Sequence, residues 1–199
     1  MKTPSIMDEN YDLLFNFIKG IIPIRDTEAW EITKAFHPFQ IKKGQLLLKE
    51  NEISDDYVYL QTGLMRTFLY DLEGNEITTE IFTENNIVFE ITSFFNRVRS
   101  DANIQAITDC KGFRLSYDEL NSLFHNKPDF RDFGRAILVK CFIASNKRNY
   151  AMINQTAEQR YQHLLTSRPE VLKYAPLKQI ASYLGVTDST LSRIRKKIQ

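Results

Sequence analysis

Cysteine and histidine are scarce in this sequence of 199 residues. The two cysteines, Cys110 and Cys141, lie far apart along the chain, which argues against a disulfide framework and favours a reducing compartment. Two thiolates are also too few to hold an iron–sulfur cluster within one chain. The three histidines, His37, His125 and His163, do not follow the spacing of metal ligands. We therefore predict surface or capping roles for them, no metal site and no bound cofactor.

Long apolar runs and the sequence motifs of common enzymes are also missing. No stretch approaches the roughly 20 apolar residues of a transmembrane helix, so we expect no membrane association. The N-terminus lacks the basic and apolar regions of a signal peptide, which predicts a cytoplasmic location. The sequence has no Gly-rich phosphate loop, no nucleophile elbow and no paired His and acid at a useful spacing. We therefore predict no catalytic residues and no enzymatic activity.

The small net charge of +1 hides two halves of opposite sign. Residues 1–126 contain 12 Lys and Arg against 20 Asp and Glu, a net charge of −8. Residues 127–199 contain 14 Lys and Arg against 5 Asp and Glu, a net charge of +9. This division predicts an acidic module joined to a basic one that is attracted to phosphates, with an affinity that falls as salt rises.

The segment Pro176–Gln199 has the pattern of two short helices joined by a tight turn. Gly185 stands where the turn needs a positive φ, and Thr187 can cap the second helix with its side-chain oxygen. Apolar or small residues recur at helical spacing on both sides of the turn, at Leu177, Ile180, Ala181, Leu184, Val186, Leu191 and Ile194. The pattern is typical of a DNA-binding helix-turn-helix.

Polar and cationic residues occupy the other face of the second helix. The predicted DNA-contacting residues are Thr187, Asp188, Ser189, Thr190, Ser192, Arg193, Lys196 and Lys197. An α-helix fits the major groove, where Arg can bond two acceptors of guanine and Lys or Ser can reach phosphates. The alternative interpretation is an ordinary amphipathic helical hairpin, which would share the two apolar stripes.

The N-terminal part is predicted to be an α+β domain. Residues from about Asp8 to Phe36 have helical patterns, with a second helix starting at Thr27. Short β-rich runs separated by turn residues then extend to about Tyr117, which predicts a β-sandwich, barrel or roll. The expected strands are Phe39–Ile41, Gln45–Lys49, Tyr57–Thr62, Leu64–Tyr70, Glu76–Phe82, Ile87–Phe89, Ile104–Asp109 and Gly112–Ser116.

Helical patterns return after Tyr117. A short helix, Tyr117–Phe124, precedes a long one from Asp129 to about Thr156, whose apolar residues recur at spacings of three and four. Such a helix can cover the β domain, pair with its copy in a dimer, or do both. We therefore divide the chain into an effector domain at 1–128, a long dimerisation helix at 129–156 and a helix-turn-helix domain at 157–199.

This order of β-roll, long helix and helix-turn-helix resembles the CRP/FNR family, whose type member is the cyclic-AMP receptor protein. The β part has Gly44, Gly63 and the Gly74 hairpin in the family's places. The C-terminal part has Ile180, Gly185, Thr190, Arg193 and Ile194 in theirs. The resemblance implies a jelly-roll effector domain, a homodimer on a palindromic operator of double-stranded DNA, and RNA polymerase as a candidate partner. It also implies that Arg193 contacts a base.

The sequence departs from the family where a cyclic nucleotide would bind. Members that bind cyclic AMP have a Gly-Glu pair followed about ten residues later by Arg-Ser-Ala. Here Glu90 keeps the ribose position, Phe89 replaces the Gly, and Ser100 and Asp101 replace Arg and Ser. Losing the phosphate arginine and gaining an acid disfavours an anion. We therefore predict that the roll does not bind cyclic AMP in the family's way.

Two alternatives remain open for this region. A shift of the alignment by one residue would bring Arg99 to the phosphate position, and Arg97 lies close by. A less polar effector could instead contact the phenylalanines around the cassette, which would otherwise belong to the core. They are Phe82, Phe89, Phe94 and Phe95.

Two further expectations concern the whole protein. A β-wing usually follows the recognition helix in this family, whereas this sequence ends at Gln199, so we expect a helix-turn-helix domain without a clear wing. The predicted function is transcription regulation in response to an unidentified effector. The alternative is a ligand-binding sensor that acts through protein contacts and has a vestigial DNA-binding domain.

Overall fold

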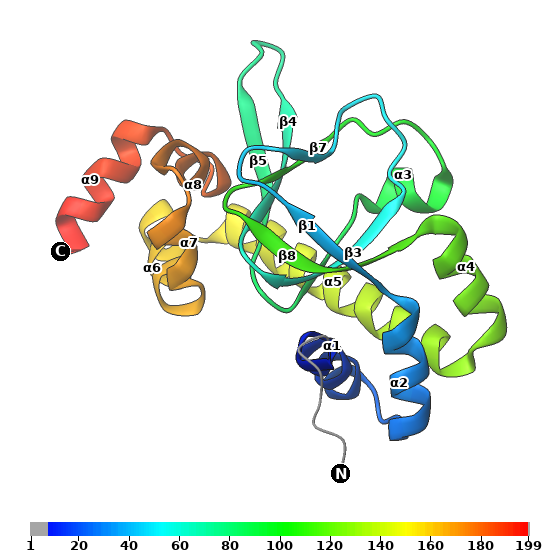
Figure 1. Ribbon diagram of the computed structural model, residues 1–199. Helices are drawn as coiled ribbons and strands as arrows, with labels where there is room; N and C mark the ends of the chain where they lie inside the picture. The colour runs from blue at the N-terminus through cyan, green and yellow to red at the C-terminus, as the bar shows by residue number, and fades with distance from the viewer. Residues whose placement is uncertain (1–7, 199) are drawn as a thin grey trace.

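The computed structural model describes residues 8–198 (Figure 1). Two helices, α1 (Asp8–Ile21) and α2 (Asp26–Ala35), come first and pack against each other. Two β-sheets follow, and the C-terminal third is helical. No helix within residues 8–198 combines the length and the apolar character needed to cross a membrane.

The β part consists of two antiparallel four-stranded sheets. The first has the order β1 (His37–Ile41), β8 (Cys110–Ser116), β3 (Asp56–Thr62), β6 (Asn86–Val88). The second has the order β2 (Leu46–Leu48), β7 (Asn103–Ala106), β4 (Met65–Tyr70), β5 (Glu76–Phe82). Strands distant in sequence are neighbours in both sheets, as in a jelly roll, which confirms the predicted fold class.

Side chains of the first sheet alternate between two cores. One set, with Val58, Leu60 and Val88, packs against Met65 and Ile104 of the second sheet. The other set includes Tyr57, Tyr59 and Phe113 and packs against the flanking helices. Both faces of the first sheet are therefore buried, and burial raises the pKa of the Tyr59 phenol to about 12.

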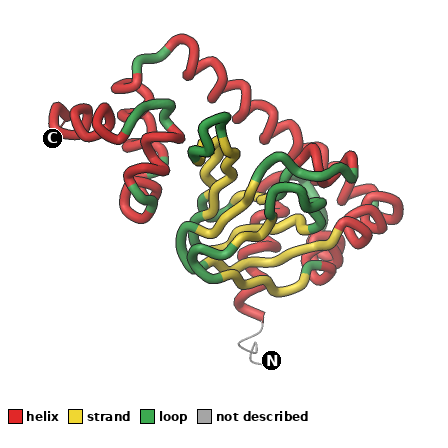
Figure 2. The backbone as a smooth tube through the Cα atoms, turned by 90° about the horizontal axis from the view of Figure 1, so that it is seen from above, coloured by secondary structure: helices red, strands yellow, loops and turns green. Residues whose placement is uncertain are grey.

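Seven helices follow the first strands. The two that precede the long helix are α3 (Ile91–Asn96) and α4 (Tyr117–Asn126). The long helix is α5 (Pro128–Asn154), and it runs past the roll towards the C-terminal helices (Figure 2). Those helices are α6 (Ala157–Ser167), α7 (Pro169–Tyr174), α8 (Leu177–Tyr183) and α9 (Asp188–Ile198).

The structure differs from the sequence prediction at two short helices and one strand end. Neither α3 nor α7 was predicted. The strand expected to run from Ile104 to Asp109 ends at Ala106, because Ile107 leaves the sheet and packs with the C-terminal helices. The other predicted strands occur with shifts of at most two residues at their ends.

Candidate DNA-binding helix and effector pocket

A tight turn joins α8 to α9. Gly185 has φ +68°, and its N–H donates to the Ser182 carbonyl at 3.0 Å. A Cβ at Gly185 would lie 2.5 Å from the Cε of Met152 on α5. Gly185 is therefore required by the left-handed turn, whereas the flexible Met152 side chain could move aside.

The apolar faces of the two helices are buried in a shared core. Ile180, Ala181, Leu184 and Leu191 are at most 2% exposed, and they pack with side chains of α6 and α7. Arg160 of α6 braces the turn, because its Nε and Nη2 donate to the Leu184 carbonyl at 3.1 and 2.9 Å. Burial and the neighbouring charge of Arg148 lower the pKa of Arg160. This core holds α9 in place and leaves its other face free.

The predicted DNA-contacting residues lie together on that free face. Six are exposed and two, Thr190 and Ser192, are half-buried; the exposed ones are Thr187, Asp188, Ser189, Arg193, Lys196 and Lys197. Thr187 Oγ1 accepts the Thr190 N–H at 3.3 Å, which caps the start of α9. Arg193 Nη2 donates to Thr190 Oγ1 at 3.2 Å, so its guanidinium is held at the surface.

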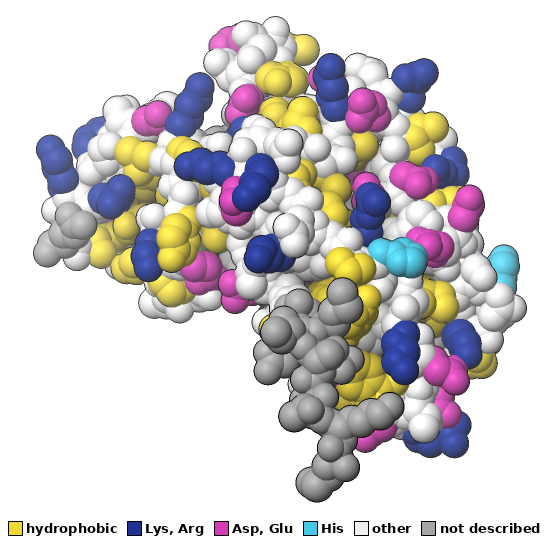
Figure 3. All heavy atoms as spheres, viewed as in Figure 1, with side chains coloured by type: hydrophobic (Ala, Val, Ile, Leu, Met, Phe, Trp, Pro, Cys, Tyr) yellow, Lys and Arg dark blue, Asp and Glu magenta, His cyan; other side chains and the backbone are white. Residues whose placement is uncertain are grey.

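Further cations surround this face. Arg195 on α9 and Lys178 on α8 are exposed, and neither was among the predicted contacts. Lys197 Nζ forms an ion pair with Glu158 Oε2 of α6 at 2.8 Å. Lys and Arg side chains gather in Figure 3 at the side of the molecule where α9 lies in Figure 1. The cluster of Lys and Arg at the end of the sequence could have indicated Arg195 as a further contact. The position of Lys178 depends on how α8 packs, which the sequence does not indicate.

Glu90, which the alignment places at the ribose position, caps α3. Its two carboxylate oxygens accept the N–H groups of Thr92 and Ser93 at 3.3 and 2.6 Å. A carboxylate at a helix N-terminus also interacts favourably with the helix dipole. Both carboxylate oxygens of Glu90 therefore bond within the protein.

The residues at the expected phosphate position are also engaged. Ser100 is 2% exposed, and its Oγ accepts the Ala102 N–H at 3.0 Å. The Ser100 carbonyl accepts the Asn51 N–H, and the Ser100 N–H donates to the Glu52 carbonyl, both at 2.8 Å. The neighbouring Asp101 is exposed. This stretch presents a carboxylate and no cation where a cyclic phosphate would need one.

Both nearby arginines bond to protein groups. Arg97, which has φ +53°, donates to the Ser54 carbonyl and to Asp55 at 2.8 Å, and its guanidinium lies 4.0 Å from the centre of the Tyr117 ring. Arg99 donates to the Asn51 carbonyl at 2.6 Å. Both side chains therefore fasten the cassette to the loop at residues 51–55.

The phenylalanines of the cassette form part of the core. Phe94 is fully buried, and Phe89 is 9% exposed with its ring centre 5.1 Å from that of Tyr57. Phe95 packs against the same cluster, whereas Phe82 belongs to the core between the sheets. Burial raises the pKa of the Tyr57 phenol. These contacts favour the core interpretation over a ligand site.

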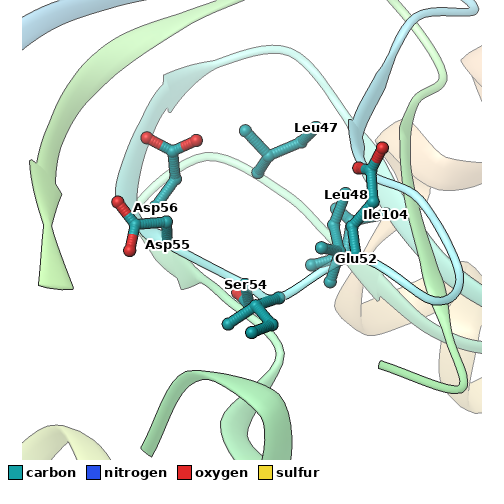
Figure 4. A pocket seen from close by; sticks show the side chains of 8 residues that line it. Leu47, Leu48, Glu52, Ser54, Asp55, Asp56 and Ile104 are labelled. Atoms are coloured by element: carbon teal, nitrogen blue, oxygen red, sulfur yellow. The ribbon is translucent and has the colours of Figure 1, made fainter. Parts of the chain in front are cut away.

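A small cavity lies beside the cassette loop, between the two sheets (Figure 4). It has a volume of about 70 Å³ and is lined by Leu47, Leu48, Glu52, Ile53, Ser54, Asp55, Asp56 and Ile104. Pockets for small-molecule ligands usually span about 300–1,000 Å³. The cavity is therefore too small for a nucleotide, and two of its three carboxylates are already paired, Asp55 with Arg97 and Asp56 with Arg114. No metal-binding group of three His, Cys, Asp or Glu occurs in the described part of the chain.

Comparisons with known proteins agree with this architecture. Residues 38–127 match the sequence profile of the cyclic nucleotide-binding domain family. No curated protein matches the chain by sequence.

Solved structures resemble the chain over most of its length. The c-di-GMP responsive global regulator CLP of Xanthomonas campestris is 17% identical, with a TM-score of 0.69 over 88% of this chain and 92% of that one. FixK2 from Bradyrhizobium japonicum is 16% identical, with a TM-score of 0.70 over 82% and 84% of the two chains. A regulator of the CRP/FNR family from Eubacterium rectale is 14% identical, with a TM-score of 0.69 over 90% and 88%.

These matches confirm the resemblance inferred from the sequence. At such low identities the structural matches establish the fold, and the profile establishes the domain. Residues 38–127 therefore match the cyclic nucleotide-binding domain family, and the chain as a whole shares the fold of these solved structures.

Proposed function

We propose that this protein is a transcription regulator of the CRP/FNR type that binds a palindromic operator with α9 in the major groove. The observation that carries the proposal is the division of α9 into two faces. Leu191 is fully buried in the helix-turn-helix core, whereas Arg193, Lys196 and Lys197 are exposed on the opposite side. A helix held rigidly by one face and cationic on the other suits the major groove of DNA.

The second half of α5 supports a dimeric regulator. Its first apolar residues, such as Phe133 and Ile137, are buried against the roll and the N-terminal helices. From residue 139 onwards large apolar side chains are exposed, and they include Val139, Phe142, Ile143, Tyr150 and Ile153. A helix with such a surface suits pairing with its own copy.

The cassette supports a regulator whose effector is not cyclic AMP. Glu90, Ser100 and the two arginines already bond to protein groups, and the adjacent cavity is small and acidic. A missing contact between a cation and a phosphate lowers affinity by about 1.5–3 kcal/mol, or tenfold and more.

Isothermal titration of the protein with cyclic AMP should therefore give no binding in the low-micromolar range. Arg99→Ala serves as the control for the shifted alignment. Binding in the parent that disappears in this variant would contradict the prediction and place Arg99 on the phosphate.

Arg193→Ala tests the assignment of α9 to the groove. The probe is a DNA site selected by this protein from a random-sequence library, in a gel-shift assay at two salt concentrations. We expect Arg193→Ala to weaken binding by about 1–3 kcal/mol and to relax the base preference at one position of each half-site. The loss of an arginine that contacts only phosphate would weaken all sequences equally.

Arg25→Ala is the matched control for this assay. Arg25 precedes α2, its side chain is 83% exposed and it pairs with Glu28. It carries the same charge but lies outside the helix-turn-helix, so its removal should leave binding unchanged. Equal binding by Arg193→Ala and the parent would refute the placement of α9. No sequence-specific retardation of the parent at either salt concentration would favour the sensor that acts through protein contacts.

A further inference from the structure

The helix-turn-helix packs against the open edge of the second sheet. β5 is the last strand of that sheet, and α8 lies alongside it (Figure 1). An edge strand leaves backbone N–H and C=O groups without partners from its own sheet. The way in which these groups are satisfied therefore determines how α8 is placed.

Ser182 of α8 satisfies two of them. Its Oγ accepts the Thr78 N–H at 2.8 Å and donates to the Glu76 carbonyl at 3.4 Å. The two groups are two residues apart on β5, as expected for positions that face the same side of a strand. The Ser182 hydroxyl thus bonds two backbone groups of β5 that a neighbouring strand would otherwise bond.

A buried arginine holds this part of β5 in position. Arg66 of β4 is 2% exposed, pairs with the Glu76 carboxylate and donates to Thr78 Oγ1 at 3.3 Å. It also donates to Gln105 of β7 at 3.1 and 2.7 Å. The segment that receives Ser182 is therefore tied to two other strands.

Arg168, between α6 and α7, makes a second polar connection to β5. Its Nη1 donates to the Ile81 carbonyl at 2.8 Å and lies 3.5 Å from a Glu80 carboxylate oxygen. Its guanidinium also bonds the Tyr183 hydroxyl, and the Tyr183 ring lies 4.1 Å from the guanidinium of Arg148 on α5. We call these bonds of Ser182 and Arg168 to β5 the docking contact.

Apolar side chains close the same interface. Leu64, Ile81 and Ile107 of the roll are at most 4% exposed, and they share one core with the C-terminal helices. Helix α8 lies between β5 and α9 (Figure 1), and Arg193, Lys196 and Lys197 of α9 stay exposed. The docking contact therefore fixes the orientation of α9 without covering its DNA-binding face.

We propose that Ser182 and Arg168 are positioning residues that set the place of α9 relative to α5, and so relative to α9 of a second copy. This inference rests on the proposed function. A dimer bound to two half-sites needs its recognition helices about one helical turn of DNA, roughly 34 Å, apart. If the C-terminal helices were freed from β5, they would lose orientational freedom when both copies of a dimer bind the two half-sites. Binding of one copy to a single half-site would carry no such cost.

Ser182→Ala tests the docking contact in the full-length protein, first without DNA. Hydrogen exchange at the Thr78 amide reports the bond to Ser182 directly. We expect this amide to exchange about twofold to tenfold faster in the variant, the effect of losing a typical hydrogen bond. Ser167→Ala is the control, because Ser167 Oγ bonds the His163 carbonyl within α6 and its loss should leave Thr78 unchanged.

The positioning role is tested with two DNA probes, the palindromic site selected by the parent protein and a duplex that carries only one half of it. Ser182→Ala and Arg168→Ala should each weaken binding to the full site by about tenfold and change half-site binding less than twofold. Circular dichroism detects a folding defect in either variant. If one variant is misfolded, the other still tests the positioning role.

Each outcome separates the possibilities. Unchanged exchange at Thr78 in Ser182→Ala would overturn the docking contact. Equal weakening on the full site and the half-site would overturn the positioning role and indicate a direct DNA contact or a damaged domain. If the parent bound no DNA at all, the proposed function and the positioning role would both fail, and the exchange measurement would still decide whether α8 docks on β5.

Discussion

Ile143→Asp is expected to convert the proposed dimer to a monomer at micromolar concentration. Ile143 is 48% exposed and lies at the middle of an apolar stripe on α5. Val139, Ile143, Asn146, Tyr150 and Ile153 recur at spacings of four and three, the heptad pattern of a two-stranded coiled coil. A carboxylate at a central position would be buried next to its own copy in the dimer.

The size of the effect follows from the cost of an unpaired buried charge. That cost is about 3–5 kcal/mol, so the dissociation constant of the dimer should rise by more than about a hundredfold. Operator binding should weaken as well, because two linked binding modules gain about 10²–10⁴ over one. Sedimentation equilibrium measures the first change and a gel shift on the full site measures the second.

Ser145→Asp is the matched control. Ser145 is exposed two residues away from Ile143 and lies off the stripe, so the same charge there should leave the dimer intact. A dimer that survives Ile143→Asp, or one that dissociates equally in both variants, would show that this stripe is not the pairing surface. The circular dichroism of the roll should be the same in all three proteins, because neither side chain belongs to its core.

Short-range patterns predicted α8, α9 and the turn between them from the sequence. The turn depends on Gly185, the cap on Thr187 and the buried stripe on Ile180 and Leu191, all within one continuous segment. Interactions between neighbouring residues determine each of these features, so one sequence suffices to find them. The strands were found for a similar reason, since alternating β-prone residues and turn residues mark each of them.

Long-range contacts could not be predicted in the same way. Ser182 bonds residues more than a hundred positions earlier in the chain, and nothing near it in the sequence indicates this. Helix α3 was missed because Ile91, Phe94 and Phe95 favour strands, and the Glu90 cap starts a helix in spite of them. The alignment found Glu90 but could not show that its carboxylate is engaged by the backbone.

Gly112→Ala should have the largest effect on stability among the glycine-to-alanine substitutions of this chain. A Cβ at Gly112 would lie 1.9 Å from the Tyr59 carbonyl oxygen and 3.1 Å from the Gln61 nitrogen. Both atoms belong to the backbone of β3, where Leu60 lies opposite Gly112 of β8. Because backbone atoms are involved, no side-chain rotation can relieve the clash. The two strands would have to separate in a sheet that is buried on both faces.

We therefore expect Gly112→Ala to lose more than about 4 kcal/mol of unfolding free energy, or to yield no folded protein. Gly20→Ala is the control, because a Cβ there has no neighbour within 4 Å and Gly20 lies in α1. It should be neutral or should stabilise the protein by about 0.5–1 kcal/mol. Urea denaturation compares the two variants with the parent. If Gly112→Ala unfolded within about 1 kcal/mol of the parent, the pairing of β3 with β8 would be wrong. The placement of the cassette and its small acidic cavity would then have to be revised, because β3 begins at Asp56, which lines that cavity.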